Sequence, residues 1–273
     1  MGERKVGPPE PWTSEETPPG AAAAATLIVV RDSPDGAPPH ILMVQRAATM
    51  KFAAGAIVFP GGRVDEADRL LAASLPHGLA SEDAAARIAA IRETIEEAGI
   101  AVGLVPMPSA AVVAAMRSAL HEGEPLGGLL NRHGVTLSLD ALEPFARWCP
   151  GRAERQGVSR IFDTRFYVAR APDAAHLATV DSTENVRLRW ATAAQVLSDC
   201  EEGREAAIFP TLRNLERLAL SASHAAVVAF ARAHPAEMVT PWREERDGEE
   251  HLCIPDHLGY PVTSQIWATL RRG

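Results

Sequence analysis

The fold is decided by Arg92-Glu93-Thr94-Ile95-Glu96-Glu97-Ala98-Gly99-Ile100, read together with Phe59-Pro60-Gly61-Gly62 upstream of it. On a helix, Glu93, Glu96 and Glu97 lie at positions i, i+3 and i+4, so their carboxylates share one face. Like charges at this spacing repel one another and weaken a bare helix. The pattern therefore predicts that a cation compensates the three carboxylates.

The residues before this stretch complete an amphipathic helix. Ile88, Ile91 and Ile95 cluster roughly opposite the carboxylates, at about 100° per residue, and predict a buried back. The helix is expected to begin at Ser81, whose hydroxyl suits an N-cap, and to end at Gly99, a suitable C′ residue. Its carboxylates would then point into open space, with only small alanine side chains beside them.

The residue types favour a metal site for phosphate chemistry. Hard carboxylate oxygens suit Mg²⁺ or Mn²⁺, and cleavage of a pyrophosphate requires charge neutralisation and an in-line water. Arg92 points to the flank, where its guanidinium suits the orientation of a carboxylate. Gly61 and Gly62 permit a sharp turn that brings the backbone close to a metal. A solvated helix face, the common fate of a charge run, is the alternative interpretation.

The composition narrows the class of protein. A net charge of −8 disfavours bulk nucleic acid as a partner, whereas a nucleotide-containing small molecule remains suitable. No apolar run of about 18 residues is present, so no membrane-spanning helix is expected. Cys149, Cys200 and Cys253 are scattered, which argues against a disulfide framework and fits a reducing compartment. The leader is acidic and Pro-rich rather than basic, so the cytoplasm is the expected location.

Apolar periodicity predicts an α+β fold, in which helices flank a mixed sheet. Residues 1–22, rich in Pro, Gly and Glu, are expected to form a disordered tail, and residues 23–273 one domain. Strands are predicted over residues 25–31, 41–46, 56–59, 100–105, 142–149, 160–170, 186–190 and 250–254. Further helices are predicted over residues 65–75, 108–122, 124–133, 192–201, 209–220 and 224–234.

The two stretches together resemble the box of the Nudix hydrolases. That box reads Gly, five residues, Glu, seven residues, then Arg-Glu-U-x-Glu-Glu-x-Gly-U, where U is apolar. Residues 92–100 match its second half, with Thr94 at an apolar position, and Gly62 matches its first residue. Asp68 stands in the place of the first Glu. Because 29 residues separate the glycine from the arginine, 16 more than in a standard box, an insertion is expected at about residues 63–80 and the role of the aspartate stays open.

An interrupted box of this kind resembles the Nudix branch that includes the mammalian peroxisomal coenzyme A diphosphatase. The resemblance covers most of residues 25–200. It implies an α/β/α sandwich with a mixed central sheet. Additional helices would come from the insertion and from a helical C-terminal extension beginning at about residue 205. This extension could complete a homodimer or close over the substrate, and its helices at residues 209–234 could also serve as an interaction module.

The same resemblance implies an enzyme that uses Mg²⁺ or Mn²⁺. Glu93, Glu96 and Glu97 would bind the metal, with Arg92 among the catalytic residues, and the Gly61 carbonyl oxygen could complete the coordination. The substrate would be a nucleoside diphosphate linked to another moiety. Coenzyme A or acyl-coenzyme A would yield 3′,5′-ADP and (acyl-)4′-phosphopantetheine. The alternatives are ADP-ribose or a dinucleotide as the substrate, or a non-catalytic Nudix-fold ligand sensor, which the intact carboxylates disfavour.

Residues outside the helix are further candidates. Glu184 precedes a strand and could bind metal or activate water, or merely cap a turn. Arg46 ends a strand near the glycine turn and could contact substrate phosphate, although an exposed strand-end arginine is the ordinary alternative. Arg165 alternates with apolar neighbours and could reach a phosphate or pair with Asp163. Gly62 is expected to lie beside the bound substrate.

Overall fold

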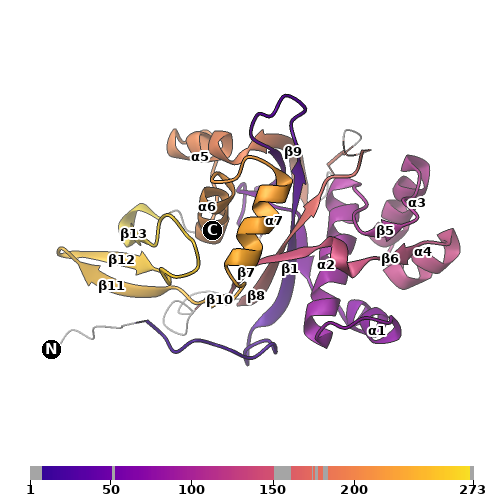
Figure 1. Cartoon of the computed structure of the whole chain (residues 1–273), viewed down its shortest axis with the longest axis horizontal. Coiled ribbons are helices and arrows are strands. Elements are labelled where there is room, and N and C mark those ends of the chain that lie inside the picture. Colours follow the sequence, from indigo (N-terminus) through magenta and orange to yellow (C-terminus); the bar gives the residue numbers. More distant parts are fainter. Residues whose placement is uncertain are drawn as a thin grey trace.

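A mixed sheet of eight strands forms the centre of the described chain (Figure 1). The structure is a computed structural model that describes residues 8–50, 53–150, 161–173, 175, 178–180 and 184–270. The strands of the central sheet are β1 (Ala22–Arg31), β2 (His40–Arg46), β3 (Ile57–Val58), β4 (Gly61–Arg63), β7 (Glu143–Trp148), β8 (Phe162–Arg170), β9 (Asn185–Thr192) and β10 (Met238–Val239).

Parallel and antiparallel pairs are combined in this sheet. The strand order is β10-β7-β8-β1-β2-β3, with β4 paired to β1 and β9 paired to β2. β1 runs parallel to β8, from the pair Ala22 and Phe162 to the pair Val30 and Arg170, and β10 runs parallel to β7. The other strand pairs of the sheet are antiparallel. The predicted mixed central sheet is therefore confirmed.

Helices lie on both sides of the sheet (Figure 1). One side carries α1 (Glu66–Ser74), α2 (Ser81–Ala98), α3 (Ala110–His121) and α4 (Leu126–His133), and the other carries α5 (Ala193–Glu201), α6 (Phe209–Leu218) and α7 (His224–Ala233). Alternate residues of β1 point to opposite faces, as the pleat of a strand requires. Leu27 and Val29 belong to the core on the α2 side, and Ile28 and Val30 to the core on the α6 side. The α/β/α sandwich is confirmed.

The acidic helix α2 is more deeply buried than its sequence predicted. Ile88, Ile91 and Ile95 are fully inaccessible, as expected for the back of the helix. The alanines at 86, 89 and 90 are buried too, although we expected them beside an open approach. The expectation was wrong because β1 and β4, α1 and α3 all pack around this helix, and small side chains let them approach its axis.

Some element boundaries also differ from the prediction. Ser81 is the first helical residue, and Ala80 holds the N-cap position without a side-chain cap bond. The strand expected over residues 100–105 is only β5 (Leu104–Val105), which pairs with β6 (Thr136–Leu137). Within the described residues, no helix is both long enough and apolar enough to cross a bilayer.

The C-terminal extension contains more strand than predicted. After α6 and α7 come β11 (Trp242–Arg246), β12 (Glu249–Cys253) and β13 (Ser264–Ile266), which form a separate three-stranded sheet. Asp247 and Gly248 both have positive φ, 52° and 81°, and form the two-residue turn between β11 and β12. An Asp-Gly pair is a recognised hairpin signal. It was missed because the strand before it is rich in charged residues and resembles a polar loop.

The apolar faces of α6 and α7 pack into the core on one side of the central sheet. Leu215, Leu218 and Val227 are buried in the core on that side of the central sheet. These helices therefore complete the sandwich. The expected homodimer stays a prediction.

Candidate active site

The glycine turn and the acidic helix meet at β4. Gly62 pairs with Ala25 of β1 and Gly61 pairs with Thr26, which places the turn against the last turns of α2. The Gly61 amide donates a hydrogen bond to Glu97 Oε2 at 3.0 Å. A Cβ atom at position 62 would overlap the carboxylate of the nearby glutamate at 93, and one at position 61 would overlap the backbone of β1. Position 61 therefore requires glycine because backbone atoms approach it, whereas a side chain at position 62 would displace the flexible Glu93 carboxylate.

The Arg92 side chain is buried, and all three nitrogen atoms of its guanidinium donate hydrogen bonds. Its Nε and Nη2 atoms donate to the two carboxylate oxygens of Asp68 at 3.0 and 2.9 Å, and Nη2 also donates to the Arg63 carbonyl oxygen at 2.8 Å. Its Nη1 atom donates to Glu93 Oε1 at 2.8 Å and to Glu96 Oε1 at 3.1 Å. Burial lowers the pKa of Arg92, but the bond to Asp68 and the neighbouring negative charges outweigh it and raise the pKa. The side chain therefore orients two carboxylates, and Asp68 is the residue that anchors it.

The positive charge near Glu93 and Glu97 is too small to offset the cost of burying their ionised carboxylates. Glu97 is 4% exposed, and burial together with the charge of Glu93 raises its pKa to about 8. Burial also raises the pKa of Glu93 to about 7, although Arg92 opposes the change. These carboxylates would gain stability from a bound cation, because a cation favours their ionised form.

Two outlying candidates lie beside this end of the helix. Arg46 ends β2 opposite Asn185 of β9, after a slip in the strand register, and its Nη2 atom is 3.7 Å from Glu184 Oε2. The charge of Arg46 and the polar side chain of Asn185 both oppose the rise in the pKa of Glu97, so both residues neighbour that carboxylate. The Glu184 side chain is 59% exposed, which leaves it at the edge of the site. The structure thus brings Arg46 and Glu184 to the acidic helix.

Comparison with known proteins supports a family relationship through structure. No protein-family model matches the sequence. The crystal structure of a NUDIX hydrolase from Alicyclobacillus acidocaldarius superposes with a TM-score of 0.63 at 25% sequence identity, and the match covers 77% of this chain and 96% of that chain. This likeness places the chain in the Nudix hydrolase superfamily.

Two other solved structures overlap less closely. The NUDIX domain of Shewanella oneidensis NrtR complexed with ADP ribose gives a TM-score of 0.41 at 13% identity, over 72% of this chain and 84% of that chain. A MutT protein from Methanosarcina mazei Go1 gives 0.40 at 12% identity, over 74% of this chain and 96% of that chain.

The polar departure from the Nudix box is accommodated within the helix. Thr94 stands where the box has an apolar residue, and its side chain is buried. Its hydroxyl donates to the Ala90 carbonyl oxygen at 2.7 Å, so the buried oxygen is satisfied by the backbone of its own helix.

Arg165 lies at the other end of the Nudix helix. Its Nη1 atom is 2.8 Å from Glu15 Oε2 and 3.7 Å from Asp83 Oδ1. Asp83 is ten residues before Glu93, which is about 15 Å along a helix axis. The structure therefore does not bring Arg165 to the carboxylates. Its direct partners are Glu15 and Asp83 rather than Asp163, although the charge of Asp163 helps to raise the pKa of Arg165.

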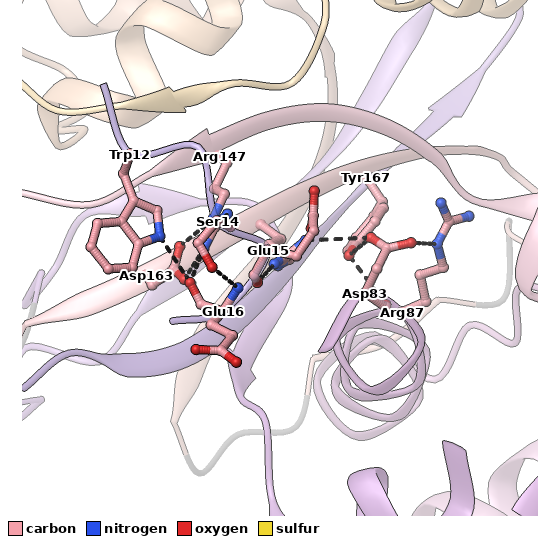
Figure 2. A network of polar contacts seen from close by, with 10 residues as sticks. Trp12, Ser14, Glu15, Glu16, Asp83, Arg87, Arg147, Asp163 and Tyr167 are labelled. Carbon is pink, nitrogen blue, oxygen red and sulfur yellow. Dashed lines mark hydrogen bonds and ion pairs between the residues drawn. The ribbon is translucent and has the colours of Figure 1, made fainter. Parts of the chain in front are cut away.

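The carboxylate of Asp163 is bound by a different arginine, Arg147, at 2.9 and 2.7 Å (Figure 2). Arg147 also donates to the carbonyl oxygens of Ser14 and Glu16 at 2.7 and 2.8 Å (Figure 2). Arg165 donates to the Glu15 carbonyl oxygen. These three residues were expected in a disordered tail, but the two arginines hold them against the sheet. No local sequence pattern indicates these contacts, because more than 130 residues separate the partners.

The donor set of the Nudix helix fits a hard divalent cation. Carboxylate oxygens are the ligands that Mg²⁺ and Mn²⁺ prefer. Among the residues that the structure describes, no three acidic, His or Cys side chains already converge as a ligand set. Arg92 Nη1 donates to both Glu93 and Glu96. This nitrogen therefore lies beside the Glu93 and Glu96 oxygens that would bind a cation. Gly61 meets Glu97 through its amide, and metal binding by its carbonyl oxygen stays a prediction.

Proposed function

We propose that this chain is a hydrolase that requires Mg²⁺ or Mn²⁺ and cleaves the pyrophosphate of coenzyme A or acyl-coenzyme A. The observation that carries the proposal is the contact of the Gly61-Gly62 turn with Glu93 and Glu97, which collects buried negative charge beside a backbone turn without side chains. The likeness to the Alicyclobacillus acidocaldarius NUDIX hydrolase supports the hydrolase class. The interrupted box supports the coenzyme A branch.

The helix carboxylates are assigned to the cation. Glu93, Glu96 and Glu97 would hold Mg²⁺ or Mn²⁺, which neutralises phosphoryl charge and lowers the pKa of a bound water. Arg92 keeps Glu93 and Glu96 in place and holds a positive charge beside them when no metal is bound. Asp68 fixes that guanidinium from the opposite side.

Residues at the edge of the site are assigned to the substrate and the water. Water attacks one phosphorus, the bond from that phosphorus to the bridging oxygen breaks, and each product keeps a terminal phosphate. Glu184 is assigned to accept the proton of the attacking water, because its carboxylate is exposed. Arg46 is assigned to a non-bridging phosphate oxygen, and Gly62 to the open backbone beside the substrate. For coenzyme A the products are 3′,5′-ADP and 4′-phosphopantetheine.

A substrate panel tests the proposal. Coenzyme A, ADP-ribose and diadenosine polyphosphates are incubated with the protein in Mg²⁺ and in Mn²⁺, and the products are identified by mass spectrometry. Coenzyme A is expected to be cleaved. Glu97→Gln is expected to lower turnover by several orders of magnitude, since the charge that compensates the metal is lost. Glu124→Gln, a change in a glutamate that pairs with Arg132 away from the acidic helix, is the control.

Each other outcome changes a specific part of the proposal. A preference for ADP-ribose or a dinucleotide would replace the substrate and keep the chemistry. Nucleotide binding without hydrolysis in either metal would favour a ligand sensor. Turnover at the wild-type rate in Glu97→Gln would refute the assignment of the site.

A further inference from the structure

The end of the acidic helix α2 is closed by groups from distant parts of the chain. The last four carbonyl groups of a helix have no partner within it. In α2, the Ile95 carbonyl oxygen accepts from the Gly99 amide at 2.9 Å, and the Ala98 carbonyl oxygen accepts from the Thr179 amide at 3.1 Å. The two carbonyl oxygens between them belong to residues 96 and 97, whose side chains are two of the three site carboxylates.

Both of these carbonyl oxygens are bound by one side chain from α3. Arg117 Nε donates to the Glu96 carbonyl oxygen at 2.8 Å, and Arg117 Nη2 donates to the Glu97 carbonyl oxygen at 3.0 Å. The remaining end of the guanidinium, Nη1, donates to Thr179 Oγ1 at 2.8 Å. Thr179 lies five residues before Glu184 in the sequence.

The charge of Arg117 suits this position. The C-terminus of a helix carries partial negative charge, and a cation there is stabilising. The last turn of α2 contains no basic residue, although Glu93, Glu96 and Glu97 add negative charge to the same end. The cation that binds the backbone carbonyl groups at this end of the helix therefore comes from α3.

Gly99 leaves room for the Arg117 guanidinium at the end of α2. It has a φ of 65°, in the left-handed region, and ends the helix. A Cβ atom there would lie 3.2 Å from Arg117 Nη1, so a larger residue would press on the guanidinium. Backbone conformation and the arginine thus both favour glycine at this position.

We propose that Arg117 is a positioning residue of the candidate active site. It fixes the last turn of α2 and thereby sets the positions of the Glu96 and Glu97 carboxylates for a divalent cation. The inference rests on the proposed function, because it assigns these carboxylates to the metal.

Binding of Mn²⁺ alone, followed by electron paramagnetic resonance, tests the inference without the need for a substrate. Arg117→Gln is expected to weaken Mn²⁺ binding by about 10-fold or more, the size of effect seen when a residue that supports metal ligands is lost. Arg117→Lys keeps the charge and is expected to restore part of the affinity. Thr179→Val removes the contact with Nη1 and is expected to have a smaller effect in the same direction. Arg132→Gln, in α4, is the matched control and should bind Mn²⁺ as the wild type does.

Amide hydrogen exchange over residues 95–99 provides a second measurement. Exchange there is expected to be faster in Arg117→Gln, while exchange in the first turns of α2 is unchanged. Wild-type Mn²⁺ affinity and wild-type exchange in Arg117→Gln would overturn the inference and leave the proposed function intact. Absence of Mn²⁺ binding in the wild type would contradict both. Faster exchange without weaker Mn²⁺ binding would reduce Arg117 to a structural cap and would also overturn the inference.

Discussion

At the scale of single residues, the site depends on close contacts of the Arg92 guanidinium and of the glycines at 61 and 62. Asp68 binds both Nε and Nη2 of Arg92, and the guanidinium then reaches two of the helix carboxylates. Two glycines complete the arrangement because neither leaves room for a side chain. What each glycine faces is different, however. Position 62 faces the end of a flexible glutamate, and position 61 faces backbone.

We therefore predict different effects of alanine at the two glycines. Gly61→Ala should lower the free energy of unfolding, because its Cβ atom would lie 2.7 Å from the Thr26 Cα atom and the backbone of β1 cannot move cheaply. Gly62→Ala should leave unfolding nearly unchanged but displace the Glu93 carboxylate, and so weaken Mn²⁺ binding about 10-fold or more. Urea denaturation and Mn²⁺ titration of both variants check this. The prediction fails if Gly62→Ala binds Mn²⁺ as the wild type does.

Some residues of the site could be predicted from the sequence and others could not. Glu93, Glu96 and Glu97 share a face because of local spacing, which the sequence contains. Arg117 and Asn185 reach the same helix only through the packing of α3 and β9, and no local pattern records that. Arg46 lies near Glu97 and pairs with Glu184, while the roles of both residues in the site stay predictions.

At the scale of elements, α2 carries its charge at an electrostatic cost. Its carboxylates lie near the helix end that already bears partial negative charge. Burial raises the pKa of Glu97 to about 8 and that of Glu93 to about 7. The usual value for a glutamate is 4.5, so the folded state binds protons more tightly than the unfolded state does.

This difference predicts a pH dependence of the metal-free protein. Between about pH 4.5 and pH 8 the folded state retains protons that the unfolded state has released, so the free energy of unfolding falls as the pH rises. Glu97→Gln should make this slope shallower, since glutamine does not titrate. Thermal unfolding in a chelator at several pH values measures both slopes. Equal slopes in the wild type and Glu97→Gln would contradict the raised pKa of Glu97. Added Mg²⁺ should raise the free energy of unfolding of the wild-type protein at pH 8.

Elements differ in how well the sequence predicted them. The strands and helices of the sandwich were recognised because apolar residues repeat along them with the right period. The short strands β4, β6 and β10 were missed because two or three residues are too few for any periodicity. β11 was missed for another reason, since its polar residues form a small outlying sheet that has little core of its own.

At the scale of the whole molecule, residues 14–16 near the N-terminus bind two arginines of the central sheet. Ser14, Glu15 and Glu16 give carbonyl or carboxylate oxygens to the buried arginines at 147 and 165 (Figure 2). Arg147 also binds Asp163 of the sheet, and Arg165 Nη1 also lies 3.7 Å from Asp83 of α2. The N-terminal residues therefore add stability to the fold and lie far from the site carboxylates.

Deletion of this segment gives a prediction for the whole fold. Removal of residues 1–16 should lower the free energy of unfolding by about 1.5 kcal/mol or more, the value of one hydrogen bond to a charged group. The kcat of the cleavage reaction should be unchanged, because α2 and β4 are not touched. Removal of residues 1–10 is the control and should alter neither quantity. A large loss of kcat in the longer deletion would show that the segment serves the site.

The hairpin of β11 and β12 projects from the side of the molecule opposite α3 and α4 (Figure 1). Its tip, the Asp247-Gly248 turn, is exposed and lies between strands that pair only within their own small sheet. Short turns of this kind tolerate insertions well. An immobilisation tether attached at this tip would therefore leave the candidate active site accessible.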